Sequence, residues 1–276
     1  MGAVPPLVAG APAAMVLQTT VRDCLYLNWA IPARSLPAVP EPLRHELHAG
    51  KDREWGFASA VLFFQEGLRM RGVPWVRLAY PQANLRFNVL DGDGLPAVYF
   101  RRMLVPLWVV PAGRVVGRQP TRAARLDFPR PSRDPEAEAW VWRARWRDGG
   151  PAGEEGLVVT ARPGAPQAPG GPDLGSWEET VRFFRERRRG YSRLAGRLRR
   201  IDTRQPPAPV WPLKVEVVGA ELVAAGLGLE PANGEGGGLG WELHSAWLCP
   251  EMSLTFEVVR APEPEEPVRR RVPAAG

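Results

Sequence analysis

One strand-like segment carries polar side chains at a spacing that could form a binding site. Asn84, Arg86 and Asn88 alternate with apolar residues, a pattern that predicts a strand with one polar face. If that face lines the interior of a barrel, the Arg86 guanidinium could hold a carboxylate through two hydrogen bonds. If it faces water, it is an ordinary solvated face. The alternation by itself favours the solvated face.

A second candidate group lies about a hundred residues later. Glu186 could exchange protons as a general acid or base, and Tyr191 could donate its hydroxyl at a pocket mouth. The structural alternative pairs Glu186 with Arg182 or Arg189 at helical spacing and buries Tyr191 by packing. The spacing favours this structural interpretation.

Other kinds of chemistry lack the residues they need. The two cysteines, Cys24 and Cys249, are not in a metal-binding spacing, and the three histidines have no identifiable third ligand. We expect buried free thiols, and the sequence leaves open whether they pair. Lys214 stands beside Glu216, which is typical of a surface pair. No glycine-rich phosphate loop or nucleophile elbow is present, so we expect neither a metal nor a cofactor.

The charge is strongly basic, with a net charge of +6 and a pI near 10.0. Residues 182–204 are rich in arginine and include Phe183, Phe184 and Tyr191. Basic residues with stacking aromatics are typical of nucleic-acid surfaces. The same spacing also describes an amphipathic helix with a solvated arginine face. We therefore expect no nucleic-acid partner, although a nucleic-acid or protein interaction module using segment 182–204 remains a third functional alternative.

The elements that must position these residues are mostly strands. Period-two alternation and turn signals predict strands at 25–31, 55–64, 84–90, 95–102, 140–147, 157–161, 241–248 and 252–258. Asp91–Gly94 predicts a tight hairpin between two of them. A capping box at Ser176 predicts a helix to about Arg189 that ends at Gly190. A second, short helix is expected at 219–227.

These elements predict a mainly β (α+β) fold, an antiparallel β barrel with one main helix and one short helix. We expect a flexible N-terminal arm at 1–20, a single barrel domain at 21–260 and a disordered tail at 261–276. The uncharged apolar run at residues 103–113 is only 11 residues long, and a membrane-spanning helix needs about 20. The N-terminus has no basic region before an apolar stretch. We therefore expect a cytoplasmic protein with no membrane partner.

The order of several motifs resembles a known bacterial family. The motifs are LYLNWAIP, WGFASAVLFF, YPQANLRFNV, GRVVGRQPTRAARLDF, FRERRRGYSRLAGRLRRID and WPLKVEVV. Together, over about residues 20–260, they resemble domain of unknown function 2071, which is grouped with the acetoacetate decarboxylase-like superfamily. The resemblance implies an acetoacetate decarboxylase-like barrel. Gln82 stands where this family usually has glutamate, Arg188 where it has tyrosine, and Asn28 where it often has histidine.

The resemblance also bears on chemistry. Acetoacetate decarboxylases use a lysine that forms a Schiff base, and their lysine pair would fall near residues 117–122. No lysine is present there, and arginine stays protonated and cannot act as an amine nucleophile. The resemblance therefore implies the fold and argues against that reaction.

Three functional hypotheses follow. The first is a protein that binds a small carboxylate-bearing molecule in a Trp-lined cavity through Gln82, Asn84, Arg86 and Tyr191. The second is a lysine-independent enzyme acting on a small organic acid, in which Arg86 binds the carboxylate and Glu186 carries the proton. The third is the interaction module described above. The sequence does not decide whether the chain catalyses a reaction, nor its oligomeric state.

Overall fold

The computed structural model describes residues 15–115, 117, 119–146, 156–166, 170–229 and 240–259. The strands are β1 Met15–Pro32, β2 Arg44–His45, β3 His48–Ala49, β4 Glu54–Met70, β5 Val73–Leu90, β6 Pro96–Val105, β7 Thr121–Asp127, β8 Trp140–Trp146, β9 Leu157–Pro163, β10 Arg189–Leu194, β11 Arg197–Arg204, β12 Trp211–Val218 and β13 Glu242–Val259. The α-helices are α1 Val110–Val115, α2 Trp177–Arg185 and α3 Ala220–Leu227, with 3-10 turns at Ala33–Ser35 and Leu107–Val109. No helix within these ranges is long and apolar enough to span a membrane.

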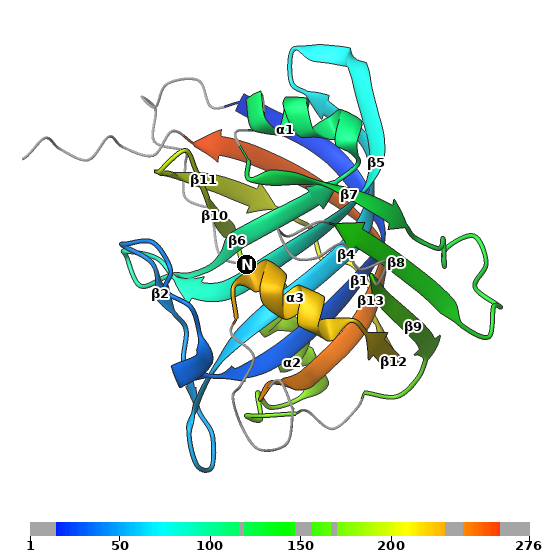
Figure 1. Cartoon of the computed structure of the whole chain (residues 1–276). Helices are drawn as coiled ribbons and strands as arrows, with labels where there is room; N and C mark the ends of the chain where they lie inside the picture. The colour runs from blue at the N-terminus through cyan, green and yellow to red at the C-terminus, as the bar shows by residue number, and fades with distance from the viewer. Residues whose placement is uncertain are drawn as a thin grey trace, which may run out of the picture.

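One curved, mixed, 13-stranded sheet makes up most of the described part of the chain, and its pairings close on themselves (Figure 1). The strands β5, β4, β1, β13, β11, β10 and β6 pair in that order, and β6 returns to β5. We call this circuit the first ring. The pairing of β6 with β10 and with β7 is parallel, so the expectation of an antiparallel barrel is wrong at β6. Its parallel neighbours arrive through long connections, which local alternation does not reveal.

A second circuit shares five strands with the first. It runs from β6 through β7, β8, β9 and β12 to β13 and returns through β1, β4 and β5. Its interior is the larger hydrophobic core, in which Trp142, Leu157 and Phe87 are completely enclosed together with Val223 and Leu227 of α3. The alternation predicted for the tryptophan-rich segment is confirmed, because Trp140, Trp142 and Ala144 are buried and the residues between them are not, and β8 pairs antiparallel with β9.

The interior of the first ring holds a separate core. It comprises the opposite faces of β1, β4 and β13 and the buried side of α2, where Val181 and Phe184 pack against Tyr26, Phe57 and Trp247. The predicted capping box begins this helix: Glu179 N–H donates to Ser176 Oγ at 3.2 Å and Ser176 N–H donates to Glu179 Oε2 at 2.8 Å. Helix α2 therefore closes one end of the first ring.

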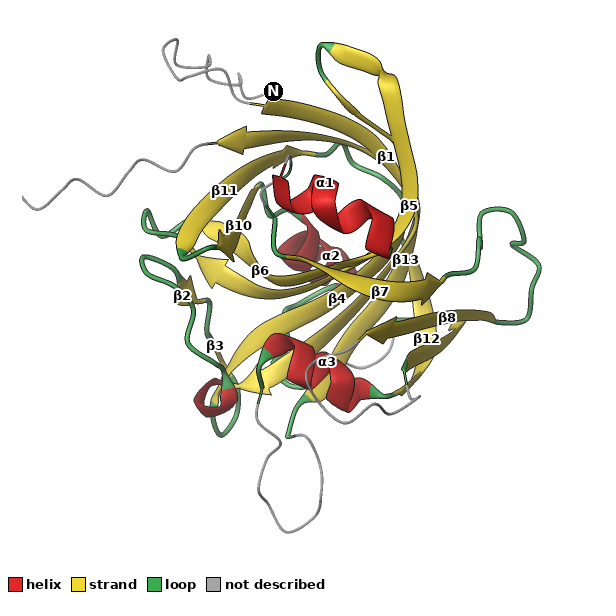
Figure 2. Cartoon of the chain, turned by 45° about the horizontal axis from the view of Figure 1, so that its top comes forward, coloured by secondary structure: helices red, strands yellow, loops and turns green. Residues whose placement is uncertain are grey.

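The other end of the first ring is crossed by α1, as Figure 2 shows. Tyr80 of β5, Val105 of β6 and Val109 form a small buried cluster there, against which Val110 of α1 packs. The sequence did not predict this helix, because Pro106 and Pro111 interrupt the apolar run and its periodicity.

Three further expectations are corrected. Met15–Thr20 is not part of a flexible arm but the first third of β1, hydrogen-bonded between β13 and β4. Helix α2 ends at Arg185, because Arg189 and Gly190 belong to β10. The two strands expected at 241–248 and 252–258 are one continuous strand, β13. The remainder of the arm, 1–14, and the tail at 261–276 lie outside the described residues.

Candidate functional site

The polar face predicted on β5 lies inside the first ring. Gln82 pairs with Phe63, Asn84 with Val61 and Arg86 with Ser59 in the ladder to β4, and Phe63 and Val61 belong to the core of the first ring. The exposed fractions are 8% for Gln82, 8% for Asn84 and 9% for Arg86, but 0% for Asn88. The face is therefore buried and not solvated.

Arg86 is an enclosed cation without a counter-ion. Its Nη2 donates to the carbonyl oxygen of Phe184 at 3.3 Å, and its guanidinium carbon lies 5.4 Å from the centre of the Tyr26 ring. Its Nε has no hydrogen-bond partner. Among the described residues, no carboxylate lies within 4.0 Å of it. A buried charge is normally paired, so Arg86 is an exception that calls for a functional explanation.

Arg187 shows how the same fold treats a buried arginine that is structural. Its Nε donates to the carbonyl oxygen of Phe183 at 2.7 Å, and its Nη1 forms an ion pair with Glu46. Burial lowers the pKa of Arg187, Glu46 opposes that shift, and the nearby charge of Arg86 lowers the pKa further. The two guanidinium groups therefore repel each other, and Glu46 compensates only one of them directly.

The side-chain amides of Gln82 and Asn84, which precede Arg86 on the same face of β5, are hydrogen-bonded to each other. Gln82 Nε2 donates to Asn84 Oδ1 at 2.7 Å. Gln82 Oε1 and Asn84 Nδ2 make no hydrogen bond to a described residue, and neither is fully enclosed. One acceptor and one donor are therefore available beside the guanidinium.

Further unpaired polar atoms lie inside the same ring. Both amide atoms of Asn88 and the hydroxyl of Ser192 on β10 are enclosed and have no partner. By contrast, the neighbouring Asn28 is satisfied, because its Oδ1 accepts from Ser59 Oγ at 2.7 Å. Buried polar groups in native proteins are nearly always hydrogen-bonded. A binding site for a polar ligand has such unpaired atoms when the ligand is not bound, and these lie on β5 and β10.

Tyr26 and Cys24 on β1 lie near Arg86, and Cys249 on β13 lies opposite Cys24. Cys24 and Cys249 are free, enclosed and directly opposite each other in the ladder. Burial raises the pKa of the Cys24 thiol and of the Tyr26 hydroxyl, and the positive charge of Arg86 opposes both shifts. All three groups are therefore neutral at pH 7 and supply no counter-charge to Arg86. The only indication in the sequence for the position of Tyr26 is the alternation in this strand, which places it on the face opposite Leu25 and Leu27.

Tyr191 and Glu186 are not brought to this site. Tyr191 packs against the larger core outside the first ring, where its hydroxyl donates to Asp91 Oδ2 at 3.3 Å. Glu186 is exposed just after α2. The expected pair between Glu186 and Arg189 is absent, because Arg189 lies in β10 and binds Asp91 at 2.5 Å and Asp93 at 3.0 Å.

The remaining candidates from the sequence lie apart from Arg86. Lys214 is exposed on β12. His45 and His244 contact backbone carbonyl oxygens, of Pro37 at 2.7 Å and of Pro172 at 3.1 Å. The described ranges contain no cluster of three or more side chains that could hold a metal ion.

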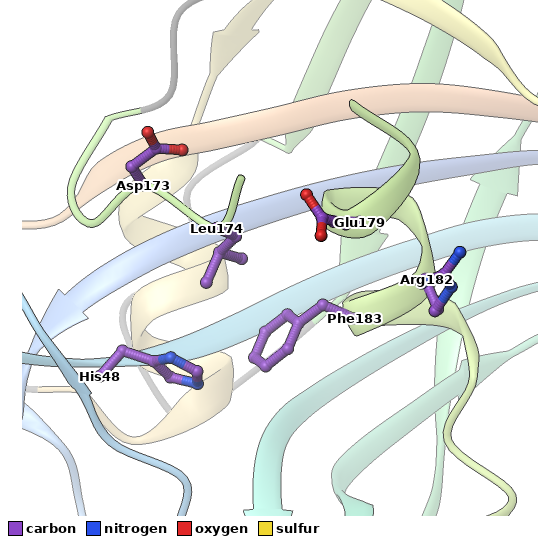
Figure 3. Close-up of a pocket in the computed structure, with 6 residues that line it drawn as sticks. All are labelled: His48, Asp173, Leu174, Glu179, Arg182 and Phe183. Atoms are coloured by element: carbon purple, nitrogen blue, oxygen red, sulfur yellow. The ribbon is translucent and has the colours of Figure 1, made fainter. Parts of the chain in front are cut away.

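A surface pocket of about 440 Å³ lies beside α2 (Figure 3). It is lined by His48, Asp173, Leu174, Glu179, Arg182 and Phe183. Its carboxylates have structural roles: Asp173 accepts the Gly175 N–H at 2.9 Å, and Glu179 completes the capping box. Hydrogen bonds from Ser176 lower the pKa of Glu179. The pocket is therefore a weaker candidate than the interior of the first ring.

Comparisons with known proteins agree on the fold. An acetoacetate decarboxylase-like enzyme from Sphingomonas wittichii RW1 superposes with a TM-score of 0.52 and 14% identity, over 92% of this chain and 94% of that one. The enduracididine biosynthesis enzyme MppR with HEPES buffer bound superposes with a TM-score of 0.50 and 11% identity, over 91% and 87%. No curated protein sequence matches the chain.

The sequence itself matches one family over most of its length. Residues 18–236 match DUF2071, described as an uncharacterized conserved protein. This range includes the β5 residues and α2. The chain is thus a member of the DUF2071 family and has the acetoacetate decarboxylase-like fold.

Proposed function

We propose that this protein binds a small carboxylate-bearing molecule inside the first ring, with Arg86 as the anion-binding residue and Gln82 and Asn84 beside it. The observation that carries the proposal is the enclosed Arg86 guanidinium, which has an unpaired Nε and no carboxylate partner among the described residues. A carboxylate would accept two hydrogen bonds from it and neutralise it.

The energetic argument is that an unpaired charge is costly to enclose. Removing an ion from water costs several kcal/mol even after the protein relaxes, and one bond to Phe184 with a contact to the Tyr26 ring offsets only about 1–4 kcal/mol of that. A bound anion would recover the rest. The free oxygen of Gln82 and the free nitrogen of Asn84 support a ligand that carries a second polar group near its carboxylate.

The alternatives have less support. A proton-transferring role for Glu186 requires it beside Arg86, whereas Glu186 is exposed after α2. Several guanidinium groups of the arginine-rich segment 182–204 form contacts within the fold. Arg185 donates to two backbone carbonyl oxygens, and Arg200 forms an ion pair with Asp202. Neither observation favours an enzyme using Glu186 or a nucleic-acid surface.

A ligand-induced thermal shift tests the proposal. The probes are acetate, pyruvate, acetoacetate, 3-hydroxybutyrate and benzoate; pyruvate is included because the MppR structures include a complex with a condensation product of pyruvate. A carboxylate that raises the melting temperature should bind Arg86→Met at least about tenfold more weakly, because a charge-assisted hydrogen bond contributes about 1.5–3 kcal/mol. Its amide or alcohol analogue should give no shift.

The matched control is Arg143→Met, which removes an exposed arginine from β8. It should bind the ligand like the unmodified protein. Equal binding by Arg86→Met and the unmodified protein would refute the proposal, as would the absence of a shift with every carboxylate at millimolar concentration.

A further inference from the structure

The α1 end of the first ring displays a group of exposed apolar side chains. Trp75 and Val76 lie at the start of β5, Leu107 and Trp108 lie in the 3-10 turn after β6, and Val115 ends α1, the helix that crosses the ring end (Figure 2). Their exposed fractions are 77% for Trp75, 73% for Leu107 and 59% for Trp108. We call these five residues the mouth rim. Large apolar side chains exposed on neighbouring segments are candidates for an interaction site.

The mouth rim rests on packed residues. Tyr80, Val105 and Val109 are buried beneath it, and Leu68, Leu78 and Val110 pack against them. The Trp108 ring stands edge-on to Tyr80, with 5.9 Å between the ring centres. The fold therefore holds the β4–β5 hairpin beside the segment that bears Trp108, and their outer side chains project into water.

The charge of these two segments has one sign. Residues 67–80 and 105–117 contain no aspartate or glutamate, while Arg71 and Arg114 are exposed within them. Glu66, which precedes the first segment, is bound by both Arg22 and Arg130. The mouth rim is thus apolar and aromatic with a basic surround.

We propose that the mouth rim docks on an anionic lipid surface. Tryptophan favours the boundary between lipid and water, and each arginine near an anionic membrane adds about 1 kcal/mol. Two copies of this chain meeting rim to rim would bring arginines against arginines. The apolar side chains stand on separate projections, at a hairpin and at a ring crossing, and a fluid bilayer accommodates such projections without a complementary pocket.

This inference goes beyond the proposed function and departs from the expectation of no membrane partner. That expectation rested on the absence of a long apolar run, which tests for spanning segments only. The mouth rim combines two short segments about thirty residues apart, so no single stretch of sequence reveals it.

Vesicle flotation tests the proposal directly. The full chain is mixed with vesicles of phosphatidylcholine alone or of phosphatidylcholine with phosphatidylglycerol. We expect binding to the anionic vesicles that weakens between about 0.15 M and about 1 M salt, since screening shortens the range of surface charge from about 8 Å to about 3 Å. Arg71→Gln should weaken this binding about fivefold, the equivalent of about 1 kcal/mol.

The decisive variant is Trp75→Ser with Trp108→Ser, which should weaken anionic-vesicle binding at least about tenfold. The matched control, Trp211→Ser with Val218→Ser, removes exposed apolar residues from β12 and should bind like the unmodified protein. Melting temperatures check that each variant folds.

No flotation at low salt, or equal flotation of rim and control variants, overturns the proposal. A concentration-dependent dimer that the rim variant abolishes, without vesicle binding, assigns the surface to a second copy instead and also overturns it.

Arg86→Met separates this proposal from the proposed function. It should lose carboxylate binding and float like the unmodified protein, because Arg86 lies inside the first ring. The rim variant should keep carboxylate binding and lose flotation. The opposite result, a rim variant that floats normally but no longer binds the carboxylate, would contradict both assignments.

Discussion

At the scale of single residues, the two enclosed arginines make opposite predictions about stability. Arg86 has no acidic partner, so Arg86→Met should raise the free energy of unfolding by about 1–3 kcal/mol, as replacing enclosed ions by apolar residues often does. Arg187 is paired with Glu46, so Arg187→Met should lower it by about 3–5 kcal/mol by leaving that carboxylate uncompensated. Urea denaturation measures both values.

A residue whose replacement raises the free energy of unfolding is expected at a binding site, because such sites often reach full stability only with the ligand bound. If Arg86→Met destabilised the protein as much as Arg187→Met, Arg86 would instead be a structural residue. The comparison is informative because both side chains approach the end of α2, at Phe184 and at Phe183.

The sequence could predict the polar face of β5 at this scale but not its surroundings. Alternation placed Asn84 and Arg86 on one face, and that grouping is confirmed. Only the family motif groups Tyr191 with them. Its neighbour Gly190 pairs with Val98 in a parallel ladder, which sends Tyr191 to the outer side of the ring. Non-local pairing decided the direction of that side chain, and nothing in segment 189–194 encodes the pairing.

At the scale of elements, Gly190 shows how a correct local rule gives a wrong boundary. Glycine after a basic helical run is a typical helix end. In the structure a Cβ on Gly190 would lie 2.5 Å from the Phe100 ring, so the glycine lets β10 lie close to β6. Gly190→Ala should therefore destabilise the protein by about 1–3 kcal/mol through overpacking.

A double-mutant cycle checks this assignment. Phe100→Leu shortens the neighbouring ring, so Gly190→Ala should cost less in that background than in the unmodified protein, by at least about 0.5 kcal/mol. Additive free energies of unfolding would contradict the contact. If Gly190 acted only as a helix end, the replacement of Phe100 would have no influence on its cost.

At the scale of the whole molecule, local patterns in the sequence predict many of the strands but not β7, β10 and β11, and they do not predict the ring closures. Hairpins such as β5–β6 and β8–β9 are encoded by turn residues and alternation between neighbouring segments. The first ring closes through β11 with β13 and β10 with β6, which joins segments more than fifty residues apart. These closures create the interior that holds Arg86, so the site depends on the part of the fold that local patterns cannot specify.

The final prediction concerns how pH acts on these long-range contacts. Burial would raise the pKa of Glu66, but hydrogen bonds from Arg130 and Arg22 outweigh it and lower that pKa. Burial lowers the pKa of His45, His48 and His244 below 6.5. For both kinds of group the unfolded chain binds protons more readily than the folded chain, so stability is present above the unfolded pKa and is lost as pH falls.

The free energy of unfolding in urea should therefore decline from about pH 7 as the histidines of the unfolded chain gain protons, and decline further below about pH 4.5 as Glu66 loses its ion pairs. Glu66→Gln should reduce the acid-range decline and should leave the decline near pH 6 intact. Asp91 also contributes to the acid-range decline, because burial would raise its pKa but hydrogen bonds from Arg189 and the backbone outweigh burial and lower that pKa. A free energy of unfolding that stayed constant between pH 7 and pH 4 would contradict the burial of these groups.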